Sequence, residues 1–197
     1  MVKIRVRSFT GESANEYKKE LARLRIQIFR EFPYLYDGTL EYEEKYLETF
    51  NESNESIIVV AFKANKVIGA STGIPLKYEP IEVKKPWIDG GYKIDEIYYF
   101  SESVLMEEYR GQGIGVNFFE EREKWAKQLN YKIAIFCGVI RKDNHPNRPI
   151  DYIPLDKFWK KRGFKKKEGV KCKMSWKEIN ELEESEKELQ FWYKNLE

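Results

Sequence analysis

Residues 109–115, Tyr-Arg-Gly-Gln-Gly-Ile-Gly, combine one cationic side chain with three closely spaced glycines. They follow a β-branched and aromatic run, Ile97–Leu105, and precede a segment with apolar residues at helical spacing. The start of a helix leaves backbone N–H groups without partners and carries a positive dipole. Glycine lets an anion approach these groups, because any Cβ would hold it away from the backbone. We therefore expect a strand-to-helix turn that binds a phosphate or pyrophosphate, with Arg110 adding a full charge.

Two common phosphate-binding motifs do not fit this turn. A dinucleotide-binding fingerprint would need glycine or alanine at Val116, and a P-loop would need a Gly-Lys pair, which the chain lacks. The pattern that fits is Arg-x-x-Gly-x-Gly, formed by Arg110, Gly113 and Gly115. It resembles the pyrophosphate loop of the GNAT superfamily of N-acetyltransferases, which binds acetyl-coenzyme A (acetyl-CoA). A glycine-rich turn without a ligand is the alternative.

The resemblance extends beyond the loop on both sides, over a block of about residues 94–164. Tyr131–Cys137 is a short apolar run typical of a buried strand. Leu155–Phe164 looks like the late helix of the superfamily, which ends in Gly-Phe, and Gly163 suits the position after a helix end. The N-terminal third is compatible with the superfamily but carries no motif that is common to it.

The resemblance also implies how the coenzyme is held. The acyl-pantetheine arm would pair with the backbone of the strand before the loop, and the pyrophosphate would lie on the loop itself. Asn117 is a further candidate contact. The coenzyme-binding candidates are Val104, Leu105, Met106, Arg110, Gly111, Gln112, Gly113, Ile114, Gly115 and Asn144.

Amine acetylation needs a group that removes a proton from the attacking amine. Glu102 and Glu96 are the leading candidates, since on a regular strand both share a face with Tyr98, Phe100 and Val104. Burial among aromatic side chains favours the neutral form of a carboxyl group and so increases its basicity. A solvated glutamate, or one paired with a lysine, is the alternative. A β-bulge in this strand would exchange the two faces.

The leaving thiolate must be stabilised or protonated. Many superfamily members use a tyrosine of the late helix for this, just before the Gly-Phe end. The matching position here is Trp159, which cannot donate a proton in that way. Either Tyr152, in the loop just upstream, replaces it as the acid, or solvent protonates the thiolate.

Two segments are candidate walls of an acceptor site. Residues 141–152 hold the only histidine, His145, between prolines that stiffen the loop. His145 has a suitable pKa for a base, although a lone histidine in such a loop is more often simply exposed. Residues 32–38 interrupt the helical pattern, and their Tyr34 and Tyr36 could hold an amine by cation–π contact. Hydrophobic packing of a link between helices is the alternative.

Other chemistries fit less well. Gly69–Gly73 matches the Gly-x-Ser-x-Gly nucleophile elbow of α/β-hydrolases around Ser71, with His145 downstream. That elbow requires a helix directly after the serine, and residues 74–80 do not form a helical pattern. One histidine and two distant cysteines, Cys137 and Cys172, give no metal-ligand spacing, and Cys137 is interpreted as a buried thiol.

Length and composition bound the remaining possibilities. A chain of 197 residues with 15% aromatic residues can form one domain with a substantial core. A net charge of +2 favours neither nucleic acid nor membrane as a partner. The absence of a signal peptide and of an apolar run of spanning length makes a cytoplasmic protein the default.

The order of the apolar patterns predicts an α/β (α+β) sandwich around a mixed sheet. This order is similar to that of the GNAT superfamily, and the resemblance implies a mixed, mostly antiparallel twisted sheet of about six to seven strands flanked by helices. We expect a single domain over residues 1–197, with a C-terminal helix over 177–197 packed on it. The stretch 75–91, with three prolines, is expected to be a loop. Strands are expected at 2–7, 57–62, 67–72, 97–105, 131–137 and 171–176, with helices at 17–28, 41–50, 114–129 and 155–164.

The residues and the resemblance together predict an N-acetyltransferase that moves an acetyl group from acetyl-CoA, or a larger acyl group from the corresponding acyl-CoA, directly to a primary amine of a small molecule or peptide. A catalytically silent acyl-CoA-binding module of the same fold is the alternative, which the missing tyrosine at Trp159 supports. The expected partners are acetyl-CoA and an amine acceptor, without a metal, nucleic acid or membrane. The protein would be a monomer or a homodimer.

Overall fold

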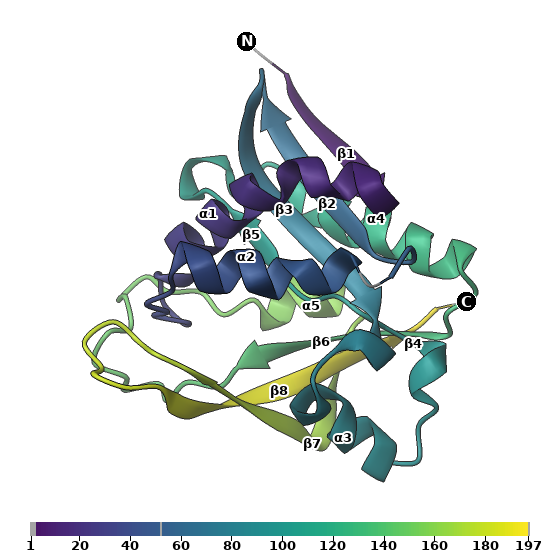
Figure 1. The fold of residues 1–197 in the computed structure, drawn as a ribbon. Coiled ribbons are helices and arrows are strands. Elements are labelled where there is room, and N and C mark those ends of the chain that lie inside the picture. Colours follow the sequence, from purple (N-terminus) through teal and green to yellow (C-terminus); the bar gives the residue numbers. More distant parts are fainter. Residues whose placement is uncertain (1–2, 52, 197) are drawn as a thin grey trace.

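The computed structural model describes residues 3–51 and 53–196, which form one eight-stranded sheet with helices on both faces (Figure 1). The strands are β1 (Ile4–Thr10), β2 (Ile57–Lys63), β3 (Lys66–Pro75), β4 (Ile97–Tyr99), β5 (Ser103–Leu105), β6 (Ile133–Val139), β7 (Lys165–Trp176) and β8 (Ser185–Asn195). The α-helices are α1 (Lys18–Phe29), α2 (Leu40–Glu48), α3 (Ile81–Asp89), α4 (Ile114–Gln128) and α5 (Asp156–Lys161).

The sheet is mostly antiparallel and runs in the order β1-β2-β3-β4-β6-β8-β7, with β5 paired to β3 beside β4. The pairing of β4 with β6 is parallel, in the register Tyr99↔Ile135. We call the face covered by α1, α2 and α3 the front, and the face covered by α4 and α5 the back (Figure 1). Each face is packed with buried apolar side chains, as the mixed α/β sandwich predicts.

The expected C-terminal helix over 177–197 is wrong, because the last element is the strand β8. β8 lies between β6 and β7 and is buried on both faces over Leu189–Trp192. Leu189, Trp192 and Leu196 are spaced by three and four residues, so the apolar residues of this segment also fit a helical period. Leu182, inside the range expected to be helical, is 97% exposed.

The expected loop over 75–91 is also wrong, because it contains the helix α3. Val83 and Trp87, one turn apart, are fully buried and fix this helix on the front of the sheet. The prolines are accommodated, since Pro75 ends β3, Pro80 precedes the first turn and Pro86 lies inside the last turn. Burial of one apolar stripe therefore outweighs the loop-forming tendency of the prolines.

Candidate functional site

The strand expected over 97–105 is broken in two by a β-bulge. Ser101 N donates to Thr72 O at 3.2 Å, and Thr72 N donates to Glu102 O at 3.1 Å. Ser101 and Glu102 therefore both lie opposite Thr72, as two residues do in a β-bulge. From the back, the guanidinium of Arg122 in α4 donates to the carbonyl oxygens of both Thr72 and Glu102, each at 3.1 Å. The bulge is thus held by a buried side chain of the neighbouring helix.

The bulge moves Glu102 to the other face of the sheet. Tyr98 and Phe100 pack into the back core, whereas Val104, on the same face as Glu102, packs into the front core. Ser103 points backward, where its Oγ accepts a hydrogen bond from Arg122 at 2.8 Å. The expectation that Glu102 shares a face with Tyr98 and Phe100 is therefore wrong, since it assumes a regular strand.

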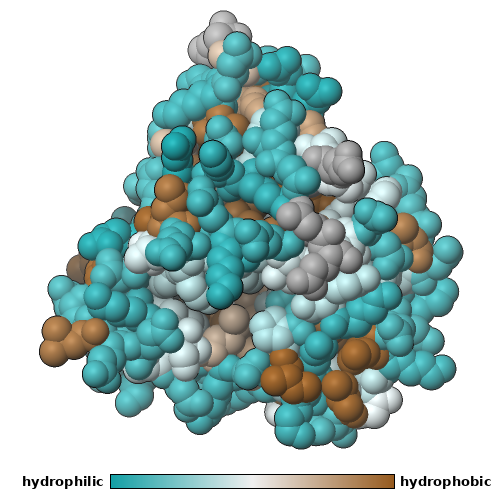
Figure 2. All heavy atoms as spheres, in the orientation of Figure 1, coloured by the Kyte–Doolittle hydropathy of each residue, from teal (hydrophilic) through white to brown (hydrophobic). Residues whose placement is uncertain are grey.

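Beyond the bulge, β5 separates from β6 and pairs only with β3 among the described residues. Met106 N donates to Ile68 O at 3.0 Å. In an antiparallel pair, successive residues direct their N–H and C=O groups alternately toward and away from the partner strand. The N–H and C=O groups of Val104 and Met106 therefore point to β3, and those of Leu105 point to the side without a partner strand. Of the three backbones expected to pair with an acyl-pantetheine arm, only that of Leu105 is oriented for it. Figure 2 shows the front face hollowed between α2 and β6, with paler side chains at the bottom of the hollow.

The glycine loop after β5 forms the strand-to-helix turn that the sequence predicts. Gly111 and Gly113 have φ angles of 74° and 83°, a left-handed conformation that favours glycine, and Gly113 is the N-cap of α4. Among the described residues, the backbone N–H groups of residues 111–115 have no hydrogen-bond acceptor. A Cβ on Gly111 or Gly113 would meet no atom within 4 Å. The loop is thus a helix N-terminus with unpaired donors and open space in front of them, which suits an anion.

The side chains around this loop are less free than its backbone. Arg110 donates through Nη2 to Glu31 Oε2 at 2.7 Å and through Nε to Leu105 O at 3.1 Å. Gln112 donates to the carbonyl oxygen of Glu108 at 3.2 Å. Arg110 therefore connects the loop to the end of α1 and to β5, in addition to supplying charge.

The remaining coenzyme candidates lie on and around α4 and in the 141–152 loop. Ile114 is buried in the back core. A Cβ added to Gly115 would lie 3.4 Å from the ring of Phe158 in α5. Asn117 and Asn144 are both exposed.

In front of the bulge lies a buried polar group that we call the front carboxylate cluster: Arg25, Glu43, Tyr46, Glu79 and Glu102. The Arg25 guanidinium forms ion pairs with Glu43 and, at 2.6 Å, with Glu102, while the Tyr46 hydroxyl donates to Glu102 at 3.4 Å. Glu79, just before α3, accepts a hydrogen bond from Ser101 Oγ at 3.2 Å. Sequence reasoning selected Glu102 alone, because the partners come from other elements.

The two expected bases differ in their surroundings. Glu102 is 6% exposed and part of the cluster. Glu96 lies in a short 3₁₀ turn before β4, and its side chain is 49% exposed beside Lys93, 3.7 Å away. Glu96 is therefore largely solvated, and the structure does not bring the carboxylates of Glu96 and Glu102 together.

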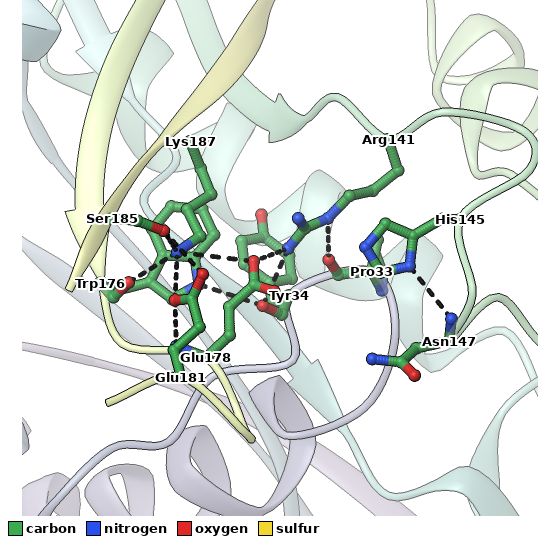
Figure 3. Close-up of polar contacts among 10 residues, drawn as sticks. All are labelled: Pro33, Tyr34, Arg141, His145, Asn147, Trp176, Glu178, Glu181, Ser185 and Lys187. Atoms are coloured by element: carbon green, nitrogen blue, oxygen red, sulfur yellow. Dashed lines mark hydrogen bonds and ion pairs between the residues drawn. The ribbon is translucent and has the colours of Figure 1, made fainter. Parts of the chain in front are cut away.

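The backbone of residues 32–38 accepts hydrogen bonds from two other segments of the chain (Figure 3). Arg141 donates to the carbonyl oxygens of Pro33 at 2.6 Å and Tyr34 at 3.1 Å, and forms an ion pair with Glu178. Trp176 Nε1 donates to Tyr34 O at 3.1 Å. The two expected acceptor walls, together with the β7–β8 hairpin, form one hydrogen-bonded unit.

Aromatic contacts extend this wall. Phe32 packs on the rings of Tyr152, with centroids 4.7 Å apart, and of His145, at 5.5 Å. Burial raises the pKa of both Tyr34 and Tyr152, and the Cys137 thiol adds to the effect on Tyr34. His145 Nδ1 accepts a hydrogen bond from Asn147 N at 3.2 Å.

Tyr36 lies on the α2 side of this segment. Its phenol has a raised pKa because of burial and of the neighbouring Glu43 carboxylate. The backbones of both tyrosines lie against the β7–β8 hairpin, since Tyr34 O accepts from Trp176 and Tyr36 forms a β-bridge with Glu178, whereas the phenol of Tyr36 lies beside Glu43 of the front carboxylate cluster.

Trp159, at the position where a tyrosine is common, belongs to the back core. Its ring packs against Phe136 and Trp192, with centroids 5.0 and 5.1 Å apart, and covers Gly138. The tryptophan at this position therefore contributes to core packing, and it lies on the face of the sheet opposite the front carboxylate cluster.

Three further expectations concern other chemistries. Ser71 is fully buried in the middle of β3, so Gly69–Gly73 is not a nucleophile elbow. Within residues 3–51 and 53–196, no group of three histidine, cysteine or acidic side chains is placed to hold a metal ion. None of the helices in that part of the chain is long and apolar enough to cross a membrane.

A groove of about 660 Å³ lies between α1 and β1–β3. Arginine and lysine side chains contribute to its lining, and of the candidate residues above it includes only Met106. We therefore place the functional site at the bulge and not in this groove.

The sheet order, the bulge and the glycine loop define the class of fold, that of the N-acetyltransferases. The chain belongs to the acetyltransferase (GNAT) family, whose model matches residues 21–164. A search of curated proteins finds no match.

Solved structures support the fold over the whole chain. Ribosomal-protein-alanine N-acetyltransferase from Brucella melitensis is 17% identical, with 98% of this chain and 99% of that chain covered and a TM-score of 0.63. A GNAT-family acetyltransferase from Staphylococcus aureus Mu50 is 15% identical, with 99% and 100% covered and a TM-score of 0.64. A protein described as an acetyltransferase from Salmonella typhimurium, with its cofactor acetyl-CoA, is 10% identical, with 98% and 94% covered and a TM-score of 0.60.

Proposed function

We propose that this acetyltransferase uses acetyl-CoA as donor and transfers the acetyl group directly to a primary amine of a small molecule or peptide. The observation that carries the proposal is the row of unpaired N–H groups at residues 111–115, in a loop where Gly111 and Gly113 have positive φ, at the end of the open strand β5. A pyrophosphate would accept from these N–H groups, and the backbone of Leu105 would face the acyl-pantetheine arm.

The front carboxylate cluster lies beside the same opening and supplies acid–base groups for the acceptor. Carboxylates near the bulge favour a cationic amine over an anionic acceptor. The wall formed by residues 32–38 and 141–152 would border that amine, with Tyr34, Tyr36 and His145 as candidate contacts and Tyr152 as candidate acid. Its backbone hydrogen bonds to Arg141 and Trp176 would keep the wall in place during binding.

A silent acyl-CoA-binding module remains the second candidate, and it is favoured by the placement of Trp159 in the back core. The two candidates agree on coenzyme binding and differ in turnover. An amine panel with acetyl-CoA separates them, because the module would bind the coenzyme and acetylate no amine.

The test of the coenzyme site is titration calorimetry with acetyl-CoA on wild type, Gly113→Ala and Gly169→Ala. Gly169 has a φ of 73° and, like Gly113, no atom within 4 Å of an added Cβ, so both changes impose similar backbone strain. Each would cost about 1–2 kcal/mol of stability. We expect at least about tenfold weaker binding for Gly113→Ala alone, because one lost hydrogen bond to an anion has that magnitude. Equal affinity of all three proteins would contradict the assignment of the loop.

A further inference from the structure

Two buried glutamates at the bulge differ in what neutralises them. Glu102 is the partner of Arg25 at 2.6 Å and accepts from the Tyr46 hydroxyl. Glu79 is 4% exposed and accepts from Ser101 Oγ, but it forms no ion pair within the described part of the chain. Two carboxyl groups in such different environments are suited to different roles, one permanently charged and one that exchanges its proton.

The fold places Glu79 directly at the bulge. Its N–H donates to Leu76 O at 3.0 Å, in the turn that connects β3 to α3, and its carboxyl group reaches Ser101, one of the two bulge residues. β5 begins two residues further along and opens the sheet beyond it. The carboxyl group therefore lies where the strand that would carry the acyl arm leaves its neighbour.

The charged groups around Glu79 come from several elements. Burial is the main cause that raises the pKa of Glu79, to about 7, and the Glu102 carboxylate adds to it. Arg25 from α1 and Lys84 from α3 oppose the shift without cancelling it. The Lys84 ammonium donates to the carbonyl oxygen of Lys77 at 3.0 Å.

The other titratable neighbours of Glu79 carry no charge near neutral pH. These are Tyr46 in α2, Tyr99 in β4 and Cys172 in β7, each of which has a raised pKa to which the charge of Glu79 contributes. Burial is the largest cause for the two tyrosines, and the hydrogen bond with Cys137 is the largest for Cys172. Among these groups, Glu79 is the one suited to exchange a proton near pH 7.

We propose that Glu79 is the proton acceptor of the transfer reaction, and that Glu102 is a fixed anion that positions Arg25 and the bulge. This rests on the proposed function. The acceptor ammonium gives one proton to the Glu79 carboxylate and becomes a neutral amine. Its nitrogen then forms a C–N bond with the thioester carbonyl carbon as the C–S bond breaks. The second nitrogen proton passes to the leaving thiolate, and Glu79 returns its proton to solvent, so that an amide and a free thiol remain.

The first test is the pH dependence of acetyl transfer from acetyl-CoA to a panel of monoamines, diamines and lysine-containing peptides. In wild type, the transfer rate should rise with pH and level off above the pKa of Glu79, about 7. We call this rise the limb of the pH–rate profile. Glu79→Gln should lose that limb and about 100-fold or more in kcat, with unchanged affinity for acetyl-CoA. Glu79→Asp should keep the limb at a reduced rate. Persistence of the limb in Glu79→Gln would overturn the proposal.

Glu102→Gln is the matched variant, since it removes the other buried carboxylate of the same bulge and should keep the limb. A limb that disappears in Glu102→Gln and persists in Glu79→Gln would exchange the two roles and overturn the assignment.

A second measurement does not depend on the acceptor. Carbon-13 NMR of the side-chain carboxyl groups in the acetyl-CoA complex, assigned with Glu79→Gln, should show Glu79 titrating near 7 and not near its ordinary 4.5. A carboxyl that titrates near 4.5 overturns the proposal even if acetyl transfer is found. Wild type that does not bind acetyl-CoA overturns the proposed function itself, and the role of Glu79 with it.

Discussion

The glycine loop and the front carboxylate cluster lie at opposite ends of one short strand but are built in different ways. The loop is a contiguous stretch, 110–115, and acts mainly through its backbone N–H groups. The cluster gathers side chains from α1, α2, the turn before α3 and the bulge. A site made of consecutive backbone groups carries its signal in the sequence, whereas a site made of converging side chains appears only once the elements are packed.

The largest effect should come from removing the cation of the cluster. In Arg25→Met, Glu43 and Glu102 stay buried without their partner, which typically costs about 3–5 kcal/mol of unfolding free energy. Arg30→Met is the control, because its ion pair with Asp37 is largely exposed, at 57% for the arginine, and should contribute less than about 1 kcal/mol. Urea denaturation of both variants at pH 8 measures the difference.

The same variant makes a prediction about pH. Two buried carboxylates without a cation favour protonation in the folded state, so that their folded pKa values rise above the unfolded ones. Stability linked to such groups is present at low pH and lost as pH rises. The loss in Arg25→Met should therefore be smaller at pH 5 than at pH 8. An equal loss at both values would mean that the carboxylates find other cations.

A smaller effect is expected at the glycine loop, and it concerns binding more than folding. Arg110→Ala should weaken acetyl-CoA binding about tenfold to 100-fold, the range for a lost hydrogen bond to a charged group. The unfolding free energy should change by less than about 1 kcal/mol, because the ion pair with Glu31 is 40% exposed or more on both sides.

Glu31→Gln tells whether Arg110 acts by charge or by holding the loop. It removes the ion pair at 2.7 Å and leaves the arginine in place. If Arg110 contacts the coenzyme, this variant binds acetyl-CoA at least as tightly as wild type. Weaker binding in Glu31→Gln would show that the connection to α1 is what matters.

The same contrast explains what the sequence could and could not predict in the fold. The glycine loop, α1, α2, α4 and the strands β2 and β3 follow from local periodicity and turn chemistry, and the structure confirms them. β8 departs from the prediction because Leu189 and Trp192 in it, with Leu196 just after it, also fit a helical period. α3 was missed because burial of Val83 and Trp87 stabilises a helix that its prolines disfavour.

The bulge shows the limit most directly. It is stabilised by the buried Arg122 of α4, whose guanidinium donates to the carbonyl oxygens of Thr72 and Glu102. Nothing in the run Ile97–Leu105 signals this contact, so alternation placed Glu102 on the wrong face. Glu79 had no local signal either, because its significance lies in the absence of an ion pair and not in its neighbours along the chain.

The smallest effect expected is on the pH dependence of stability at Glu79. Its folded pKa of about 7 lies above the ordinary value of 4.5, so the fold favours the neutral acid. That contribution is complete below about 4.5 and is lost as pH rises to about 7, whereas Glu79→Gln stays neutral throughout. Relative to wild type, Glu79→Gln should gain at least about 1 kcal/mol between pH 5 and pH 8, roughly one pKa unit. Other titrating groups are common to both proteins and cancel in this difference. A stability difference that does not change with pH would mean that Glu79 is ionised in the fold, and that its carboxylate has a cation as partner, as Glu102 has.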